Sequence, residues 1–372
     1  MCLRVLQVVG SMNRGGAETL LMNLYRKMDR EKVQFDFVVH DRKKGDYDDE
    51  IKALGGKIYY MPHYNVINHL FYVKEWHQFF LTHPQYPIIH GHMRSTAAIY
   101  LKMAKKYNRT AIAHSHGTSS RGNVIEKFVK ALMQYPIRYT ADYFFACSKE
   151  AGIWLFGSKI CQSHRFKILN NAIDSSQFIF SEDLKMKKSI ELEIEQRFVI
   201  GHVGNFDTVK NHAFLLEIFN CVCKKEPTCR LLLVGAGNSS LQKAIKEKVE
   251  QKGLSNKVQF LGKRTDVHEL LNIIDVFVFP SLHEGLPVVI IEAQANGLMC
   301  LLSDTISKEV AITENVEFIS LKRPAEFWAE RILFYKNNYE RKNMQEAIKH
   351  AGYDINRSVQ WLTKYYLTIV SE

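Results

Sequence analysis

Two glutamates with seven residues between them, Glu284 and Glu292, have the types and spacing that most clearly suggest chemistry in this sequence. The chain between them begins like a tight turn that leads into a helix, because glycine frees the backbone and proline suits a first helical turn. Unpaired N–H groups at a helix start attract an anion, and carboxylates accept hydrogen bonds from hydroxyl groups. A ligand that is part phosphate and part sugar would suit both kinds of group. The first residues of this turn are Gly285, Leu286, Pro287 and Val288.

The elements that must position these residues are a strand and a helix. Residues 276–279 form a short apolar run of β-branched and aromatic side chains, which is typical of a buried parallel strand. Pro280 ends this run, and residues 288–295 continue as the helix. The turn therefore lies at the carboxyl end of a strand, where open α/β sheets bind their ligands.

The stretch from Glu284 to Glu292 resembles the E-x7-E signature of retaining, nucleotide-sugar-dependent glycosyltransferases of family 4, which have the GT-B fold. Two glutamates at this spacing also occur on the solvated face of an ordinary helix. Only further motifs of the family elsewhere in the chain distinguish these two interpretations.

Two adjacent glycines, Gly15 and Gly16, follow a predicted strand at residues 3–10 and precede a predicted helix at residues 19–28. Glycines there let main chain approach a ligand closely. The loop lacks the Gly-Lys-Ser/Thr ending of a Walker loop and is not G-x-G-x-x-G. It resembles the Gly-Gly-Ala-Glu loop of the same family, which implies contact with the donor diphosphate; a plain turn is the alternative.

Two pairs of histidines end predicted strands, His90 with His92 and His114 with His116. Residues two apart in a strand share a face, so each pair projects together. A metal site is one interpretation, but no Asp or Glu ligand lies near in sequence, and we expect no metal. The resemblance implies one histidine that contacts the donor sugar at the end of the second strand, and register favours His116 over His114.

The second half of the chain begins with a predicted strand at residues 198–204, followed by Asn205 and Lys210. This segment resembles the Gly-Arg…Lys segment of the family, in which a basic pair holds the leaving diphosphate. Lys210 matches, whereas Asn205 stands at the arginine position and keeps hydrogen bonds but not charge. Arg264 or Lys263 are the candidate substitutes for the missing cation.

Two further segments of the second half resemble donor-binding parts of the family. Gly235 and Gly237 form a glycine turn after a predicted strand, although a lone G-x-G is weak support for a dinucleotide site. Residues 258–267, which include Leu261 and Arg264, resemble the segment whose backbone reads the nucleotide base. All these motifs occur in family order along nearly the whole chain.

The length of 372 residues favours two domains. We expect α/β architecture of the GT-B type, with two doubly wound Rossmann-like domains facing across a cleft. The acceptor-side domain is predicted at residues 1–174, a linker at 175–196 and the nucleotide-sugar domain at 197–354. The last helix, 355–372, is expected to cross back onto the first domain, as the resemblance implies.

The net charge of +11 allows an anionic partner, but no nucleic-acid-binding motif is present, and we expect no nucleic acid. A basic patch between residues 101 and 140, which has a single acidic residue, fits an anionic membrane surface better. The apolar face of a predicted helix at 122–135 fits either core packing or that membrane. The basic residues of the patch are Lys102, Lys105, Lys106, Arg109, Arg121, Lys127, Lys130 and Arg138.

No apolar run approaches the roughly 18 residues that span a bilayer, and residues 1–10 do not form a signal peptide. We therefore expect a cytoplasmic protein, peripheral at the inner face of the plasma membrane. The seven cysteines have no framework spacing and favour free thiols over a metal cluster.

The resemblance implies transfer of a hexose or N-acetylhexosamine from a nucleotide sugar, without metal and with retention, to a sugar hydroxyl of a lipid-linked or polysaccharide acceptor in bacterial surface-polysaccharide synthesis. A UDP-sugar is the favoured donor, and GDP-mannose stays open. Lys210 is expected to stabilise the diphosphate, and Glu284 and His116 to contact the donor sugar. Glu292 is expected to hold the ribose hydroxyls. A nucleotide-sugar 2-epimerase and a non-catalytic nucleotide-sugar-binding partner subunit are the alternatives.

Overall fold

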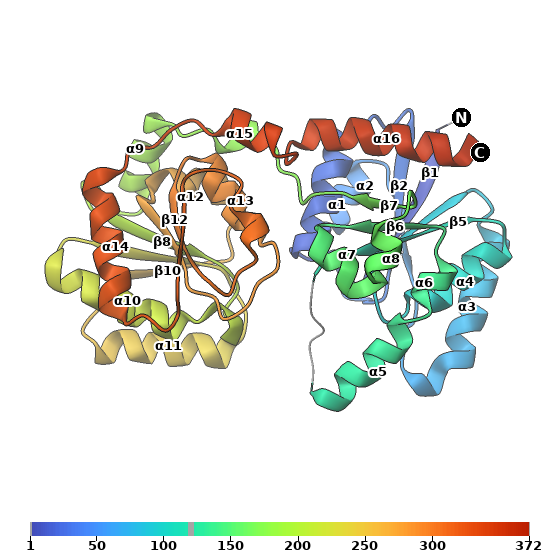
Figure 1. Cartoon of the computed structure of the whole chain (residues 1–372), viewed down its shortest axis with the longest axis horizontal. Coiled ribbons are helices and arrows are strands. Elements are labelled where there is room, and N and C mark those ends of the chain that lie inside the picture. Colours follow the sequence, from blue (N-terminus) through green and yellow to red (C-terminus); the bar gives the residue numbers. More distant parts are fainter. Residues whose placement is uncertain (1, 118–122, 372) are drawn as a thin grey trace. The chain divides into compact units, whose positions relative to one another are not determined.

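The computed structural model describes residues 2–117 and 123–371 and divides the chain into two compact units (Figure 1). The first unit consists of Met1–Ile173 and Gly352–Glu372, and the second consists of Asp174–Ala351. Each unit contains one sheet in which all the strands run parallel, with helices on both faces of the sheet. The predicted α/β class with two doubly wound sheets is confirmed.

The sheet of the first unit has the strand order β3-β2-β1-β4-β5-β6-β7. Its central strands are buried because helices cover both faces, as parallel sheets require; every residue of β2 is buried. The strands are β1 (Leu3–Val8), β2 (Val33–Val39), β3 (Ile58–Tyr60), β4 (Ile88–Gly91), β5 (Thr110–Ser115), β6 (Tyr143–Ala146) and β7 (Phe166–Ile168).

Successive side chains of β1 point to opposite faces of this sheet, and each face has its own core. Val5 joins the core beneath α1 and α16, whereas Leu6 joins the core beneath α3 and α4. The helices of the unit are α1 (Gly16–Lys27), α2 (Asp48–Ala53), α3 (His69–Thr82), α4 (Ala97–Lys106), α5 (Val124–Gln134), α6 (Ile137–Thr140), α7 (Lys149–Phe156), α8 (Ser158–Cys161) and α16 (Ile355–Ser371), with a 3₁₀ turn, η1, at Val66–Asn68.

The C-terminal helix α16, red in Figure 1, belongs to the first unit although it follows the whole second unit in the chain. It contacts α1, and its apolar residues lie in the core on that face of the sheet. The return begins where the amide of Ile173 donates to the carbonyl oxygen of Tyr353 at 2.9 Å. The apolar spacing that predicts this helix thus corresponds to a buried stripe: Ile355, Val359, Leu362, Tyr366 and Ile369.

The sheet of the second unit has the strand order β10-β9-β8-β11-β12-β13. All residues of β11 and β12 are buried, which fits the continuous apolar character of residues 276–279. The strands are β8 (Val199–Val203), β9 (Arg230–Val234), β10 (Val258–Gly262), β11 (Val276–Phe279), β12 (Met299–Ser303) and β13 (Val316–Ile319).

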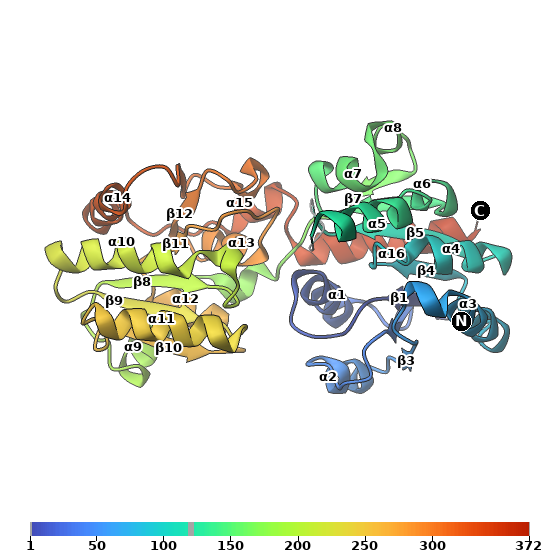
Figure 2. The same ribbon diagram turned by 90° about the horizontal axis from the view of Figure 1, so that it is seen from below.

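Helices α10 and α11 lie on opposite sides of β8 and β9 in the view of Figure 2. The helices of this unit are α9 (Glu182–Glu191), α10 (His212–Lys225), α11 (Ser239–Gln251), α12 (Val267–Ile273), α13 (Val288–Ala295), α14 (Ala325–Asn338) and α15 (Gln345–His350), with 3₁₀ turns η2 (Ser175–Phe178), η3 (Thr208–Lys210) and η4 (Lys308–Val310).

The segment 175–196, expected to be a linker, is instead an ordered part of the second unit. It contains η2 and α9, and α9 packs against α12. The Lys188 ammonium group is mostly buried and pairs with Glu191, Asp266 and Glu269 at 2.8–2.9 Å. The charged composition that suggests a linker is therefore explained by an ion-pair network that attaches α9 to the unit.

The strand order reverses once in each sheet, between β1 and β4 in the first unit and between β8 and β11 in the second. At such a point the loops that follow the two strands diverge toward opposite faces and leave room for a ligand. Ligand-binding sites are therefore expected at the loops after β1 and β4 and at the loops after β8 and β11.

Helix α5 exposes the apolar face for which core packing was one interpretation. The described side chains of this face project into solvent; Ile125 is 75% exposed and Phe128 is 65% exposed. Leu132 and Tyr135 are also exposed. The expected helix start at residue 122 and the basic Arg121 lie outside the described residues. No helix in the described ranges is long and apolar enough to cross a membrane.

Candidate functional site

An ion pair joins the two loops at the strand reversal of the second unit. The ammonium group of Lys210, which follows β8, lies 2.6 Å from a carboxylate oxygen of Glu284, which follows β11. The two side chains are only 17% and 21% exposed. The structure thus brings together two residues that are 74 positions apart in the sequence and that were predicted separately.

Backbone and side-chain hydrogen bonds hold these two loops together on either side of Lys210. The amide of Leu282 donates to the carbonyl oxygen of Val209 at 2.8 Å. The side-chain amide of Asn211 donates to the carbonyl oxygen of Pro280 at 3.1 Å. Asn211 has the left-handed conformation, with φ 55°, which asparagine tolerates better than most residues. Its side chain therefore fixes the loop at the turn where Lys210 leaves η3.

Asn211 was not predicted as a site residue. The only signal in the sequence is an asparagine placed directly between the lysine and a helix, where a left-handed residue is common.

The surroundings of Lys210 and Glu284 restrain both side chains. The Lys210 ammonium group also lies 4.4 Å from the centre of the Phe279 ring, a favourable cation–π contact. The Glu284 backbone bridges to Ile306, and its carbonyl oxygen accepts from the amide of Ser307 at 3.3 Å. The Lys210 ammonium group and the Glu284 carboxylate therefore lie together at one edge of the sheet, where each can exchange its partner for a group of a ligand.

Glu292 lies in α13, and its carboxylate makes no hydrogen bond or ion pair with the described residues. Burial raises its pKa to about 7. The helix begins at Val288, as the sequence predicts, and Pro287 precedes it with extended backbone instead of lying in its first turn. An unpartnered carboxylate in a largely buried position is costly unless a ligand or solvent satisfies it.

Gly235 and Gly237 allow the loops after β8 and β9 to approach each other closely. Both have positive φ, 145° and 149°. A Cβ atom on Gly235 would collide with the carbonyl group of Gly204, and one on Gly237 would collide with the backbone of Phe206. The amide of Phe206 donates to Ala236 at 2.8 Å. These glycines therefore have a structural reason beside the predicted contact with the donor.

Arg264 does not offer a free cation. Its guanidinium group donates to both carboxylate oxygens of Asp266, at 2.8 and 2.6 Å, and lies 3.3 Å from Glu191. This contact holds the pKa of Asp266 well below its usual range. The predicted substitution of Arg264 for the missing arginine conflicts with this engagement. Asn205 is exposed at the end of β8, and Leu261 lies in β10 one residue before Gly262.

In the first unit, Gly15 precedes α1 and Gly16 is its first residue. A Cβ on Gly15 would collide with the carboxylate of Glu18, whereas the space around Gly16 is open. Burial raises the pKa of Glu18. The space beside Gly16, at the start of the helix, is open to a ligand, and contact with the donor diphosphate stays a prediction.

Four histidine rings gather at the ends of β4 and β5. His90 stacks on His92 and on His114, with ring centres 4.5 and 5.2 Å apart, and the His114 and His116 centres are 4.0 Å apart. Burial lowers the pKa of all four, to about 3 for His90 and His116. Both ring nitrogens of His114 lack a hydrogen-bond partner among the described residues, whereas those of His92 are both engaged.

His90, His92 and His114 each have a ring nitrogen within 4.8 Å of the others, as a metal site would need. The stacking of His90 on the other two argues against such a site. Lone pairs of imidazole nitrogens lie in the ring plane, and His90 is inclined by only 25° to His92 and 20° to His114. Lone pairs in such nearly parallel planes do not converge on one ion, as tetrahedral coordination requires.

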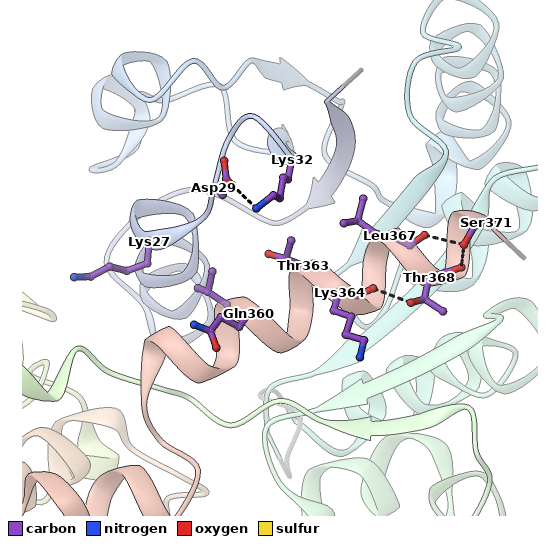
Figure 3. Close-up of a pocket in the computed structure, with 10 residues that line it drawn as sticks. Lys27, Asp29, Lys32, Gln360, Thr363, Lys364, Leu367, Thr368 and Ser371 are labelled. Carbon is purple, nitrogen blue, oxygen red and sulfur yellow. Dashed lines mark hydrogen bonds and ion pairs between the residues drawn. The ribbon is translucent and has the colours of Figure 1, made fainter.

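Two surface grooves lie away from all of these residues. One, of about 550 Å³, lies between the end of α1 and α16 in the first unit, where Lys27 and Lys364 flank an ion pair between Asp29 and Lys32 (Figure 3). The other, of about 660 Å³, includes Arg341 in the second unit. Neither contains a residue predicted for the site.

Comparison with known proteins bears on what the two sites do. The model of glycosyltransferase family 4 matches residues 14–177, and the model of glycosyl transferases group 1 matches residues 185–353. EpsF of Bacillus subtilis strain 168, a protein named as a glycosyltransferase, is 38% identical over 98% of this chain and 96% of its own length. CapH of Staphylococcus aureus, named as a capsular polysaccharide biosynthesis glycosyltransferase, is 24% identical over 98% of this chain and 99% of its own.

Among solved structures, HepE of Anabaena in complex with UDP-glucose superposes with a TM-score of 0.79 at 18% identity, over 98% of this chain and 99% of that one. The similarity to HepE supports the fold only. The family assignment rests on the two family models, which match consecutive parts of the chain, and on EpsF, which aligns over nearly its full length. The chain therefore belongs to glycosyltransferase family 4 and has the GT-B fold.

Proposed function

We propose that this glycosyltransferase moves a hexose or N-acetylhexosamine from a UDP-sugar to a sugar hydroxyl of a lipid-linked or polysaccharide acceptor, with retention of anomeric configuration and without a metal ion. The observation that carries the proposal is the pairing of Lys210 with Glu284 at the strand reversal of the second unit. The name of CapH supports a role in bacterial surface-polysaccharide synthesis, and the complex of HepE with UDP-glucose supports the donor class.

In the proposed reaction the bond from the anomeric carbon to the diphosphate oxygen breaks, and a bond to the acceptor oxygen forms on the same face of the sugar. The acceptor hydroxyl proton passes to the leaving phosphate, so that no carboxylate nucleophile is needed. Negative charge grows on the diphosphate as the bond breaks. Fixed cations and backbone N–H groups stabilise such charge most effectively when they are already in place.

Lys210 is proposed to meet this charge. In the unliganded chain its ammonium group is held by Glu284, and a bound diphosphate would take the place of that carboxylate. Glu284 would then turn to hydroxyl groups of the donor sugar. After the exchange the ammonium group still has an anionic partner and the carboxylate has hydrogen-bond donors, which limits the cost of desolvating them.

Glu292 is proposed to hold the ribose hydroxyls of the nucleotide. Its carboxylate has no partner among the described residues, and two neighbouring hydroxyl groups would satisfy it. Because burial raises its pKa to about 7, a ligand that donates to the ionised form should lower that pKa. The backbone at Gly15 and Gly16 is proposed to contact the diphosphate, and His116 the donor sugar.

A thermal-shift screen of the purified protein in EDTA tests the donor assignment. UDP, GDP, ADP and their common sugar conjugates are compared, and UDP and one UDP-sugar are expected to raise the melting temperature. No shift with any nucleotide would contradict the proposal. A shift with GDP-mannose alone would replace the donor.

The anomeric outcome needs a separate measurement. Transfer to a lipid-linked sugar acceptor is followed by proton NMR of the new linkage, which should keep the configuration of the donor. An epimerised sugar released without acceptor would indicate a 2-epimerase. Binding without turnover for any acceptor, with Glu284→Gln changing only the affinity, would indicate a binding subunit.

Helix α5 is proposed to contact an anionic membrane surface. Its exposed apolar side chains, led by Ile125 and Phe128, accompany basic residues on the same part of the chain. Such a combination inserts shallowly at a bilayer interface. Flotation with vesicles that contain anionic lipid should recover the wild type and lose Ile125→Ser/Phe128→Ser. Equal recovery of both would contradict the proposal.

A further inference from the structure

A chain of hydrogen bonds runs from the first strand to His116. Nε2 of His92 lies 2.8 Å from the side-chain carbonyl oxygen of Gln7, and Nδ1 of His92 lies 2.7 Å from Nε2 of His116. Gln7 lies in β1 and is fully buried. His92 and His116 directly follow β4 and β5, so three neighbouring strands hold the three side chains in line.

The chemistry of these groups fixes the position of each proton. A carbonyl oxygen accepts hydrogen bonds only, so Nε2 of His92 must carry the hydrogen that it donates to Gln7. A neutral imidazole has one N–H, which leaves Nδ1 of His92 as an acceptor. Nε2 of His116 must therefore be the donor to it. Nδ1 of His116 is left with a lone pair, and it has no hydrogen-bond partner among the described residues.

Both rings are held neutral. Burial lowers the pKa of His92 and of His116, to about 3 for His116. The other titratable groups that act on the two rings are Arg94, which lowers the pKa of His116, and His90, which lowers that of His92. His114 packs against both rings and is also held neutral by burial.

The side-chain oxygen of Gln7 is the atom that faces His92. Its amide nitrogen is buried and makes no hydrogen bond with the described residues. Burial raises the pKa of the neighbouring Tyr366, and the Gln7 side chain lowers it. The Tyr366 hydroxyl group bonds to Nδ1 of His90 at 2.6 Å.

We propose that Gln7 and His92 are positioning residues that fix His116 as a neutral imidazole protonated at Nε2, so that its Nδ1 accepts a hydrogen bond from a hydroxyl group of the bound sugar. This rests on the proposed function, in which His116 contacts the donor sugar. An unprotonated, uncharged nitrogen repels phosphate oxygens and offers them no hydrogen, so His116 selects for the sugar part of the donor and leaves the diphosphate to other groups.

The tautomer is tested first, on the unliganded full-length protein. Two-bond nitrogen–proton NMR with ¹⁵N-labelled histidine distinguishes the two neutral tautomers, and the signal of His116 is identified by its loss in His116→Gln. We expect the Nε2–H form at pH 7.5, and the Nδ1–H form to gain population in Gln7→Leu. A wild-type His116 protonated at Nδ1, or at both nitrogens, would overturn the inference.

Kinetics test the consequence with matched pairs of variants. Gln7→Leu and His92→Leu remove the acceptor and should lower kcat/KM for the nucleotide sugar about tenfold, the fold-change that a lost buried hydrogen bond of about 1.4 kcal/mol gives. Gln7→Glu and His92→Gln keep an acceptor oxygen and should retain activity within about threefold. His90→Asn disturbs the same histidine stack without joining the chain to His116 and serves as the control.

The affinity for UDP without a sugar separates positioning from general damage. It should stay within about twofold of wild type in all five variants, because the diphosphate does not depend on His116. Equal losses in Gln7→Leu and His90→Asn, or a loss of UDP affinity in step with activity, would overturn the inference. If the chain transferred no sugar at all, the proposed function would fail, while the NMR result would still decide the tautomer.

Discussion

The candidate regions of the two units occupy comparable places in their sheets and treat charge in opposite ways. In the second unit, Lys210 and Glu284 form an ion pair at the strand reversal. In the first unit, four stacked histidines next to the reversal are held neutral by burial. The same topology thus provides a charged site in the second unit, which can stabilise developing charge, and a neutral site in the first unit, which can orient the uncharged groups of a ligand.

This difference suggests a division of labour for a reaction in which a diphosphate gains charge and a sugar must be oriented. Charged groups with fixed positions stabilise the leaving group. Neutral imidazoles select hydroxyl groups without attracting phosphate. Variants that change the charge in either region test this difference.

Mild acid should unfold the first unit before the second. The pKa of a buried histidine is lowered in the folded state, so the unfolded chain binds more protons below about pH 6.5 and stability falls with pH from there. Each such histidine costs about 1.4 kcal/mol between pH 7.5 and 5.5. In the described part of the chain, lowered values occur at five histidines of the first unit, against His202 and His212 in the second.

Hydrogen exchange at pH 7.5 and 5.5, read separately for the two sheets, measures this loss. A matched pair of variants sharpens it, because His114 and His212 are both buried with neither ring nitrogen bonded among the described residues. His114→Phe should reduce the acid sensitivity of the first unit only, and His212→Phe that of the second only. Equal acid sensitivity of the two sheets would contradict the account of the histidine stack.

Variants of the uncharged Asn211 should weaken the contact between the two loops that hold Lys210 and Glu284. Asn211→Ala loses the hydrogen bond to Pro280 and strains a left-handed backbone, at about 1 kcal/mol each. Asn211→Gly keeps the backbone free and loses only the bond. We expect the alanine variant to destabilise the second unit by about 2 kcal/mol and the glycine variant by about half of that, as measured by chemical unfolding.

Both Asn211 variants should also lower kcat, because Lys210 is the preceding residue and shares the turn. A stability loss with unchanged kcat in both would show that the bond between the loops has no role in positioning Lys210.

Adding a second cation should strengthen the charged site modestly. Asn205→Arg places a guanidinium group at an exposed position at the end of β8, near where the family resemblance expects the diphosphate. Arg264 is already engaged by Asp266 and Glu191 and does not supply that charge. UDP affinity should rise about tenfold, as one charge-assisted hydrogen bond allows. No change in calorimetry would mean that another group already compensates.

The strands and the overall class were predictable because buried parallel strands are continuous apolar runs, as at residues 276–279. The ends of the elements were less predictable. Helix α1 begins at Gly16 instead of residue 19, because glycine has a low helix propensity and does not indicate a helix. The segment 175–196 looks like a linker by composition, and only the contacts of Lys188 with residues about 80 positions away show otherwise.

The site was predictable where a local motif marked it and not where distant residues combine. Lys210 and Glu284 each stand in a recognisable segment. Gln7 is a single polar residue in an apolar strand, and its partner His92 lies 85 positions away. No spacing in the sequence links the two. The exposed face of α5 was ambiguous for a related reason, because the same amphipathic pattern serves a core and a membrane surface.

The most direct test of the account is the affinity for UDP, by calorimetry in EDTA at pH 7.5, of three proteins: wild type, Lys210→Met and His116→Gln. Loss of a largely buried charged partner costs about 1.5–3 kcal/mol, so Lys210→Met should bind UDP at least about tenfold more weakly. His116→Gln should stay within about twofold of wild type while losing sugar transfer. Unchanged affinity in Lys210→Met, or a matching loss in His116→Gln, would contradict the division between a charged and a neutral site.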